Sequence, residues 1–167
     1  MADKILAQIV YGKGAHVDPI ACLENLSAAV AARKSPGYPH CIWQLVDHMN
    51  YWMDYDLRTI AGEHPAYPKH ASESWPEPPA QPEQEKWQAV TRRFSELLKR
   101  IAALAESDSA TLERIVIKPE PGDSRRECTT HAALWEIVAH NSYHIGQIAL
   151  LRRQAGAWPP ERGGDTW

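Results

Sequence analysis

Apolar residues recur at intervals of three and four in four stretches of the chain, which is the spacing of a buried helix face. The most regular stretch, residues 129–156, predicts a helix about 40 Å long at 1.5 Å per residue. Its apolar face carries Ala133, Ile137, His140, His144, Ile148 and Leu151. A second stretch, from about Pro39 to Ala61, carries Cys41, Leu45, His48, Trp52 and Tyr55 on one face. Histidines therefore stand on the apolar faces of two long helices.

Two further stretches complete the predicted set of helices. Asp18 and Pro19 form a typical helix start, a capping side chain followed by proline, for a helix that runs to about Lys34. Another helix is predicted from Pro82 to about Glu106, and residues 2–12 predict a short amphipathic piece. Four long amphipathic helices predict an all-α fold, a four-helix bundle, formed by residues 1–167 as a single domain.

The connections between these helices are less regular. Residues 63–81 contain five prolines and no periodicity, which predicts a loop. Fully extended, this loop reaches roughly 60 Å, more than the about 33 Å of the preceding helix, so the next helix can run parallel to it. The apolar patch LERIVI, residues 112–117, fits a short strand or a helical turn equally well. Gly146, inside the last helix, suggests the close approach of a neighbouring backbone.

Composition narrows the class of protein. The chain of 167 residues is long enough for one substantial core, and its net charge of −3 comes from well-mixed acids and bases. Because the arginine pairs are scattered, we expect no nucleic-acid partner. No apolar run is long enough to span a bilayer and the N-terminus lacks a signal-peptide pattern, so we expect a cytoplasmic protein with no membrane association. Three widely spaced cysteines, Cys22, Cys41 and Cys128, favour reduced thiols over disulfides.

The candidate chemistry lies in His48, His140 and His144. Two histidines one helical turn apart often occur together by chance, and a lone His-x-x-x-His pair is a moderate signal. Here, however, all three imidazoles fall on faces that should be buried, where an imidazole without a partner costs free energy. We therefore predict that the three bind one divalent metal ion, zinc or nickel, with coordination positions left open as in catalytic sites.

No general base accompanies these ligands in the sequence. Asn141 stands where the HExxH helix of zinc proteases has its glutamate. Glu136, one turn before His140, could orient that ring or transfer a proton, but a solvated charge on the helix surface is the favoured interpretation. The five other histidines are interpreted as surface or capping residues: His16, His40, His64, His70 and His131. Catalytic and cofactor-binding residues remain unassigned at this stage.

Two segments resemble a known family. HCIWQLVDHMNYW, which begins at His40, and HNSYHIGQIALLRRQAGAWPP, which begins at His140, resemble the DinB/YfiT-like superfamily of metal-dependent enzymes. The resemblance implies an up-down-down-up four-helix bundle, in which residues 63–81 form the crossover between parallel helices. It also implies that His48, His140 and His144 bind nickel or zinc, and that the protein forms a homodimer.

Two functions follow from this resemblance and from the residues. The first is a metal-dependent enzyme acting on a small molecule, either a thiol-dependent S-transferase or a hydrolase, with a low-molecular-weight thiol as a second cofactor of the transferase. The alternative is a non-catalytic, stress-related module in which the metal is structural or sensory. Four arginines are candidates for an anionic thiol, although a solvated surface is the default interpretation for them: Arg92, Arg93, Arg152 and Arg153.

Overall fold

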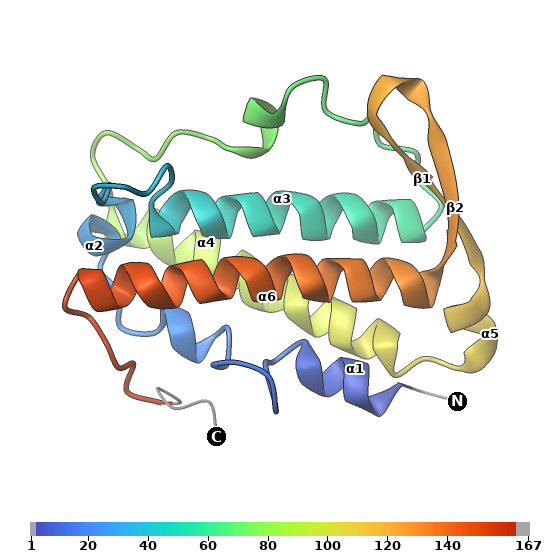
Figure 1. Ribbon diagram of the computed structural model, residues 1–167, viewed down its shortest axis with the longest axis horizontal. Helices are drawn as coiled ribbons and strands as arrows, with labels where there is room; N and C mark the ends of the chain where they lie inside the picture. Colours follow the sequence, from blue (N-terminus) through green and yellow to red (C-terminus); the bar gives the residue numbers. More distant parts are fainter. Residues whose placement is uncertain (1–2, 163–167) are drawn as a thin grey trace.

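Three long helices dominate the computed structural model, which describes residues 3–162: α3 (Ile42–Ile60), α4 (Gln84–Ala105) and α6 (Thr130–Gln154). α3 and α6 lie side by side and run in opposite directions, while α4 packs behind them and runs in the same direction as α3 (Figure 1). The chain returns from the end of α3 to the start of α4 through the proline-rich loop, which passes along α3 (Figure 1). The parallel arrangement that the loop length allowed is therefore the one observed.

The shorter elements frame these three helices. α1 (Lys4–Ile9), the 3-10 turn η1 (Ala21–Leu23) and α2 (Ala28–Ala32) precede α3, and the turn η2 (Ala71–Ser74) lies in the proline-rich loop. α5 (Ser109–Glu113), β1 (Ile115–Pro119), the turn η3 (Pro121–Asp123) and β2 (Arg125–Thr129) connect α4 to α6. Among the described residues no helix is both long and apolar enough to cross a membrane.

The prediction of one long helix from Asp18 to Lys34 is wrong. Asp18 does cap a helical start, because its Oδ1 accepts hydrogen bonds from the backbone amides of Ile20 and Ala21. The helix then stops, since Asn25 adopts a left-handed conformation with φ of 55°, and Ser27 caps the separate helix α2. Trp87 Nε1 donates to the Leu26 carbonyl at 3.0 Å, so contacts with α4 replace the helical hydrogen bonds across this break.

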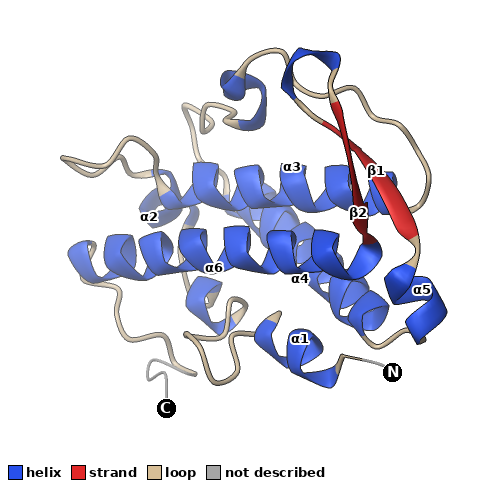
Figure 2. Cartoon of the chain, turned by 45° about the vertical axis from the view of Figure 1, so that its right-hand side comes forward, coloured by secondary structure: helices blue, strands red, loops and turns tan. Residues whose placement is uncertain are grey.

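The all-α prediction is also incomplete, because β1 and β2 form a small antiparallel hairpin (Figure 2). The LERIVI patch thus supplies the last residues of α5 and the start of β1, and Val116, paired with Cys128, is buried against the core. Lys118 extends from β1 to Asp56 on α3 and Glu136 on α6, at Nζ–oxygen distances of 2.9 and 2.8 Å. The hairpin is therefore tied to both helices that carry the candidate histidines.

Gly146 does not mark the close approach of a backbone, as its position inside α6 suggested. It is exposed, and a Cβ atom built on it would have no atom within 4 Å. Its φ is not in the left-handed region, so nothing in the described contacts requires glycine there.

We accordingly expect Gly146→Ala to stabilise the protein. Alanine is favoured over glycine in a helix interior by roughly 0.5–1 kcal/mol because it loses less backbone entropy on folding. Urea denaturation of the variant and the wild type would measure the gain. A loss of stability of that size would show that Gly146 has a role that these contacts do not account for.

Candidate metal centre

The side chains of His48, His140 and His144 come together between α3 and α6. His140 Nε2 lies 3.1 Å from Nε2 of His48 and 3.1 Å from Nε2 of His144, and one nitrogen from each of the three rings lies within 4.8 Å of the others. His48 and His144 are only 6% and 5% exposed. The i, i+4 spacing on α6 and the antiparallel packing of α3 thus bring together the three residues that the sequence selected.

Hydrogen bonds fix the tautomers of two of these rings. His48 Nδ1 donates to the Ser74 carbonyl at 3.0 Å, and His144 Nδ1 donates to Gln147 Oε1 at 2.7 Å. In the neutral form each ring has one N–H, so both Nε2 atoms carry a lone pair that points towards His140. His140 Nε2 can donate a proton to only one of them, so at least one of the two lone pairs has no hydrogen-bond donor.

A divalent cation resolves this conflict. Three nitrogens bound tetrahedrally to zinc at about 2.0–2.1 Å lie about 3.3 Å apart, close to the two observed 3.1 Å separations. Partners on the far side of two rings, such as Ser74 and Gln147 here, are also typical of metal-ligating histidines. The three side chains therefore fit a zinc or nickel ion.

Burial keeps these imidazoles neutral. It lowers the pKa of His48 to about 3, and the neighbouring His140 and His144 lower it further, although the hydrogen bond to Ser74 opposes the shift. It lowers the pKa of His140 to about 4, with a further contribution from His144. The pKa of His144 is lowered for the same reason. Neutral rings are the form that binds a metal ion.

Comparison with known families agrees with this geometry. The sequence model of the DinB superfamily matches residues 20–148, which include all three histidines. The chain belongs to the DinB superfamily. No curated protein and no solved structure matches it.

Two pockets border the histidine cluster of this DinB superfamily member. The first, which we call the Trp52–His140 pocket, has a volume of about 250 Å³ and is lined by Trp52, Met53, Asp56, Tyr67, Glu136, Ile137 and His140. The second, the His40–His144 pocket, has a volume of about 240 Å³ and is lined by Tyr38, Pro39, His40, Leu45, Trp75, Tyr143, His144, Gln147 and Leu151. Each is large enough for a small molecule next to one of the candidate ligands.

The proline-rich loop covers the cluster between these pockets. The Trp75 indole stacks on the His48 imidazole, with ring centroids 3.6 Å apart and planes within 8°. His40 stacks on the opposite face of the same indole at 3.8 Å and 6°. Together with the hydrogen bond from His48 to Ser74, this stacking shows what the loop does: it holds the orientation of one candidate ligand.

The carboxylates near the cluster are occupied by ion pairs. Glu136 accepts hydrogen bonds from Lys118 and Arg126 at 2.8 to 2.9 Å, which fits the interpretation of a charged residue on the helix surface rather than a partner of His140. Asp56 is paired with Lys118. Neither carboxylate is positioned as a free base.

Two of the remaining histidines differ from the sequence interpretation. His40 is part of the stack on Trp75 and lines a pocket rather than lying on an open surface. His16 Nδ1 donates to the Val17 carbonyl, and its Nε2 lies 2.9 Å from Ser142 Oγ, so it joins the N-terminal segment to α6. In the sequence, His40 stood out only as the first residue of the segment HCIWQLVDHMNYW, which did not indicate stacking.

None of the four candidate arginines lines either pocket beside the histidine cluster. Arg152 is 3% exposed, and its guanidinium donates to the backbone carbonyls of Cys22 and Ala157, so it holds η1 and the C-terminal segment against α6. The candidate role for Arg152 in binding an anionic thiol is therefore wrong. Arg153 instead lies over the Trp158 ring, 4.5 Å from its centroid.

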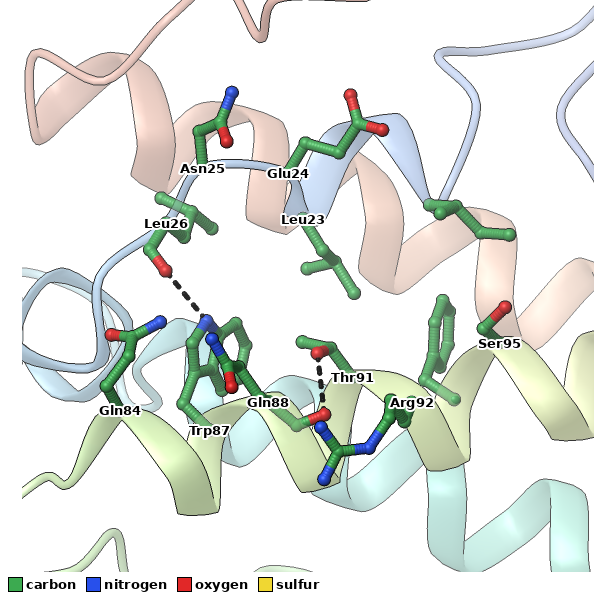
Figure 3. Close-up of a pocket in the computed structure, with 12 residues that line it drawn as sticks. Leu23, Glu24, Asn25, Leu26, Gln84, Trp87, Gln88, Thr91, Arg92 and Ser95 are labelled. Carbon is green, nitrogen blue, oxygen red and sulfur yellow. Dashed lines mark hydrogen bonds between the residues drawn. The ribbon is translucent and has the colours of Figure 1, made fainter.

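A third pocket, of about 340 Å³, lies between residues 20–26 and α4. Leu23 points from its segment toward α4, and the Trp87 indole reaches the Leu26 carbonyl (Figure 3). Its charged lining residues are Glu24, which is paired with Arg162, and Arg92. Because it contains no histidine, cysteine or cluster of acids, this pocket is a weaker candidate for chemistry than the two beside the histidines.

Proposed function

We propose that the protein is a metal-dependent enzyme in which His48, His140 and His144 bind one zinc or nickel ion. One observation carries the proposal: ring nitrogens of two buried histidines and the half-buried His140 converge with too few protons to satisfy one another. Burying ring nitrogens that lack hydrogen-bond donors costs folding free energy unless a cation binds them. Membership of the DinB superfamily supports the same ligand set.

The donor set favours catalysis over a closed structural site. Three protein ligands leave at least one position of a tetrahedral ion open, and the two flanking pockets give small molecules room beside His140 and His144. When bound, the ion would lower the pKa of a coordinated water or thiol and so supply a nucleophile at neutral pH.

The surrounding residues would position the ligands and exclude water. Ser74 and Gln147 hold the tautomers of His48 and His144, and Trp75 shields one face of His48 from solvent. In the Trp52–His140 pocket, aromatic and aliphatic side chains would bind the apolar part of a small-molecule substrate. Two separate pockets suit a reaction with two substrates, such as S-transfer from a low-molecular-weight thiol, and hydrolysis would use one of them.

A non-catalytic module remains the second candidate. The ligands come from two different helices, so an ion would link α3 to α6 and add folding free energy. The ion-paired state of Asp56 and Glu136 favours this alternative, because it leaves no carboxylate free to act as a base.

Two further features belong to the proposal. In an up-down-down-up bundle, α1, η1 and α2 together would take the place of the first helix, ahead of α3, α4 and α6. The superfamily resemblance also favours a homodimer, which sedimentation analysis would test directly.

Elemental analysis of the purified, untagged protein tests the metal site. We expect about one zinc or nickel ion per chain, as a single three-histidine site requires. After the bound ion has been replaced with cobalt, addition of a small thiol such as glutathione should produce a thiolate-to-cobalt absorption band if the enzyme is an S-transferase. A bound metal that responds to no thiol would favour hydrolysis or a structural role, and a chain that takes up no metal would overturn the proposal.

A further inference from the structure

His40 lies outside the ligand cluster and shares a pocket with a candidate ligand. It lines the His40–His144 pocket together with His144, so a molecule bound there would lie beside both imidazoles. The pocket volume of about 240 Å³ corresponds to about eight water molecules at 30 Å³ each, which is room for a small organic molecule.

The orientation of His40 is fixed without using its ring nitrogens. Trp75 lies between the rings of His40 and His48, nearly parallel to both, so His40 lies one indole layer away from a candidate ligand. His40 Nδ1 is buried, and no described residue lies within hydrogen-bonding distance of it. Buried polar atoms in folded proteins nearly always have partners, so this unpartnered nitrogen leaves the His40 ring, beside the pocket, without a hydrogen bond that commits it to the protein.

The charges around His40 leave its ring neutral. Its charged neighbours, Lys34 and Glu77, form an ion pair with each other at 3.3 Å and act on His40 in opposite directions. Burial has the larger effect and lowers the pKa of His40. A neutral imidazole can accept a proton.

Among the described residues that line the two pockets, no other side chain combines these properties. Asp56 and Glu136, which line the Trp52–His140 pocket, are already held by Lys118 and Arg126. Asn141, at the position of the glutamate in HExxH proteins, cannot accept a proton. Imidazole is also the side chain best suited to proton transfer near neutral pH.

We propose that His40 is the proton acceptor of the site, acting on a small nucleophile with an ionisable S–H or O–H group bound in the His40–His144 pocket. This inference rests on the proposed metal centre. In the step, the S–H or O–H bond breaks, its electron pair stays on sulfur or oxygen, and the proton moves to a ring nitrogen of His40. The products are the thiolate or oxyanion, on the side of His144, and the His40 imidazolium.

Titration calorimetry can measure how many protons are released to the buffer when a probe binds. Zinc-loaded wild type and His40→Gln would each be titrated with 2-mercaptoethanol and with acetohydroxamate at neutral pH, in phosphate and in Tris. The two buffers differ in ionisation enthalpy, so the difference in heat reports the protons released. We expect almost none from the wild type, because the anion formed beside His40 raises the pKa of its imidazole and so keeps the proton there, and about one per bound probe from His40→Gln.

His70→Gln is the matched control, because His70 is exposed and does not line the His40–His144 pocket. It should release as few protons as the wild type. Nitrogen NMR of the wild-type His40 ring gives a test that needs no variant: the ring should change from imidazole to imidazolium when the probe binds.

Each outcome is decisive. Equal proton release from the wild type and His40→Gln, or a His40 ring that stays neutral, would overturn the assignment while leaving the metal centre intact. Failure of both probes to bind the zinc-loaded protein would also overturn it, because the pocket would then not hold such a nucleophile. Failure to load zinc, measured separately by elemental analysis, would instead reject the metal centre itself.

Discussion

His140→Ala is expected to abolish stoichiometric metal binding and to leave the fold intact. His140 is the central ring of the cluster, because its Nε2 lies 3.1 Å from Nε2 of both other histidines. Loss of a residue that only orients a ligand costs about 10-fold to 100-fold in metal affinity, so loss of a ligand should cost at least about 100-fold. Competition with a chromophoric chelator would measure the zinc affinity of both proteins.

Thermal unfolding gives an independent measurement of the same variant. A ligand present at 100 times its dissociation constant stabilises a protein by about 2.7 kcal/mol, and only the wild type should gain this from zinc. Without metal, the two proteins should differ less in stability, because His140 can then hydrogen-bond to only one of the other two rings.

His64→Ala is the control for this prediction, since His64 is exposed and lies at the start of the proline-rich loop, outside the cluster. It should bind zinc as the wild type does. Unchanged affinity in His140→Ala would mean that the ion is bound elsewhere, and loss of binding in both variants would point to an effect not specific to the ligands.

The three candidate ligands could be found from the sequence because local periodicity determines where they point. His140 and His144 are one turn apart on the apolar face of α6, and His48 lies on the apolar face of α3. Two amphipathic helices that pack in a common core must turn these faces toward each other. No knowledge of the loops is needed for that step.

The break between η1 and α2 could not be found in this way, because distant residues stabilise it. The Leu26 carbonyl is bonded to Trp87, the Ala28 amide to Gln84, and the Cys22 carbonyl to Arg152. These partners lie 56 to 130 residues away in the sequence, and they replace bonds that a continuous helix would have made. The apolar spacing of the segment remained helical although its backbone did not.

The pocket around His40 was missed for a related reason. Trp75, which stacks on both His40 and His48, lies in a loop with no periodicity, so its position depends on the packing of the whole loop. A histidine at the start of a helix is ordinarily a surface residue. Only the contact with a residue 35 positions later in the chain changes that interpretation for His40.

Lys118→Met is expected to destabilise the protein by about 3 kcal/mol, because it leaves Asp56 buried without its counter-ion. The side chains of Lys118 and Asp56 are 12% and 11% exposed, and Lys118 also donates to Glu136. The substitution therefore removes a contact that joins β1, α3 and α6. Urea denaturation at neutral pH would measure the loss of unfolding free energy.

The unfolding free energy lost in Lys118→Met should depend on pH. Burial already raises the pKa of Asp56 above its ordinary value of 3.8 in the wild type, against the opposing effect of Lys118. Without Lys118 this pKa rises further, so between 3.8 and the higher folded-state value the folded protein binds a proton that the unfolded chain does not. Unfolding free energy then falls as pH rises through that window, and the deficit relative to the wild type should be smallest in acid.

Two comparisons separate this mechanism from a general effect of replacing lysine. Lys86→Met removes a lysine that is 61% exposed and paired with Glu83, and should cost no more than about 1 kcal/mol. Asp56→Asn combined with Lys118→Met should recover part of the loss, because the uncompensated charge is gone. If Lys118→Met were as mild as Lys86→Met at every pH, the hairpin would not depend on this ion pair for its attachment to α3 and α6.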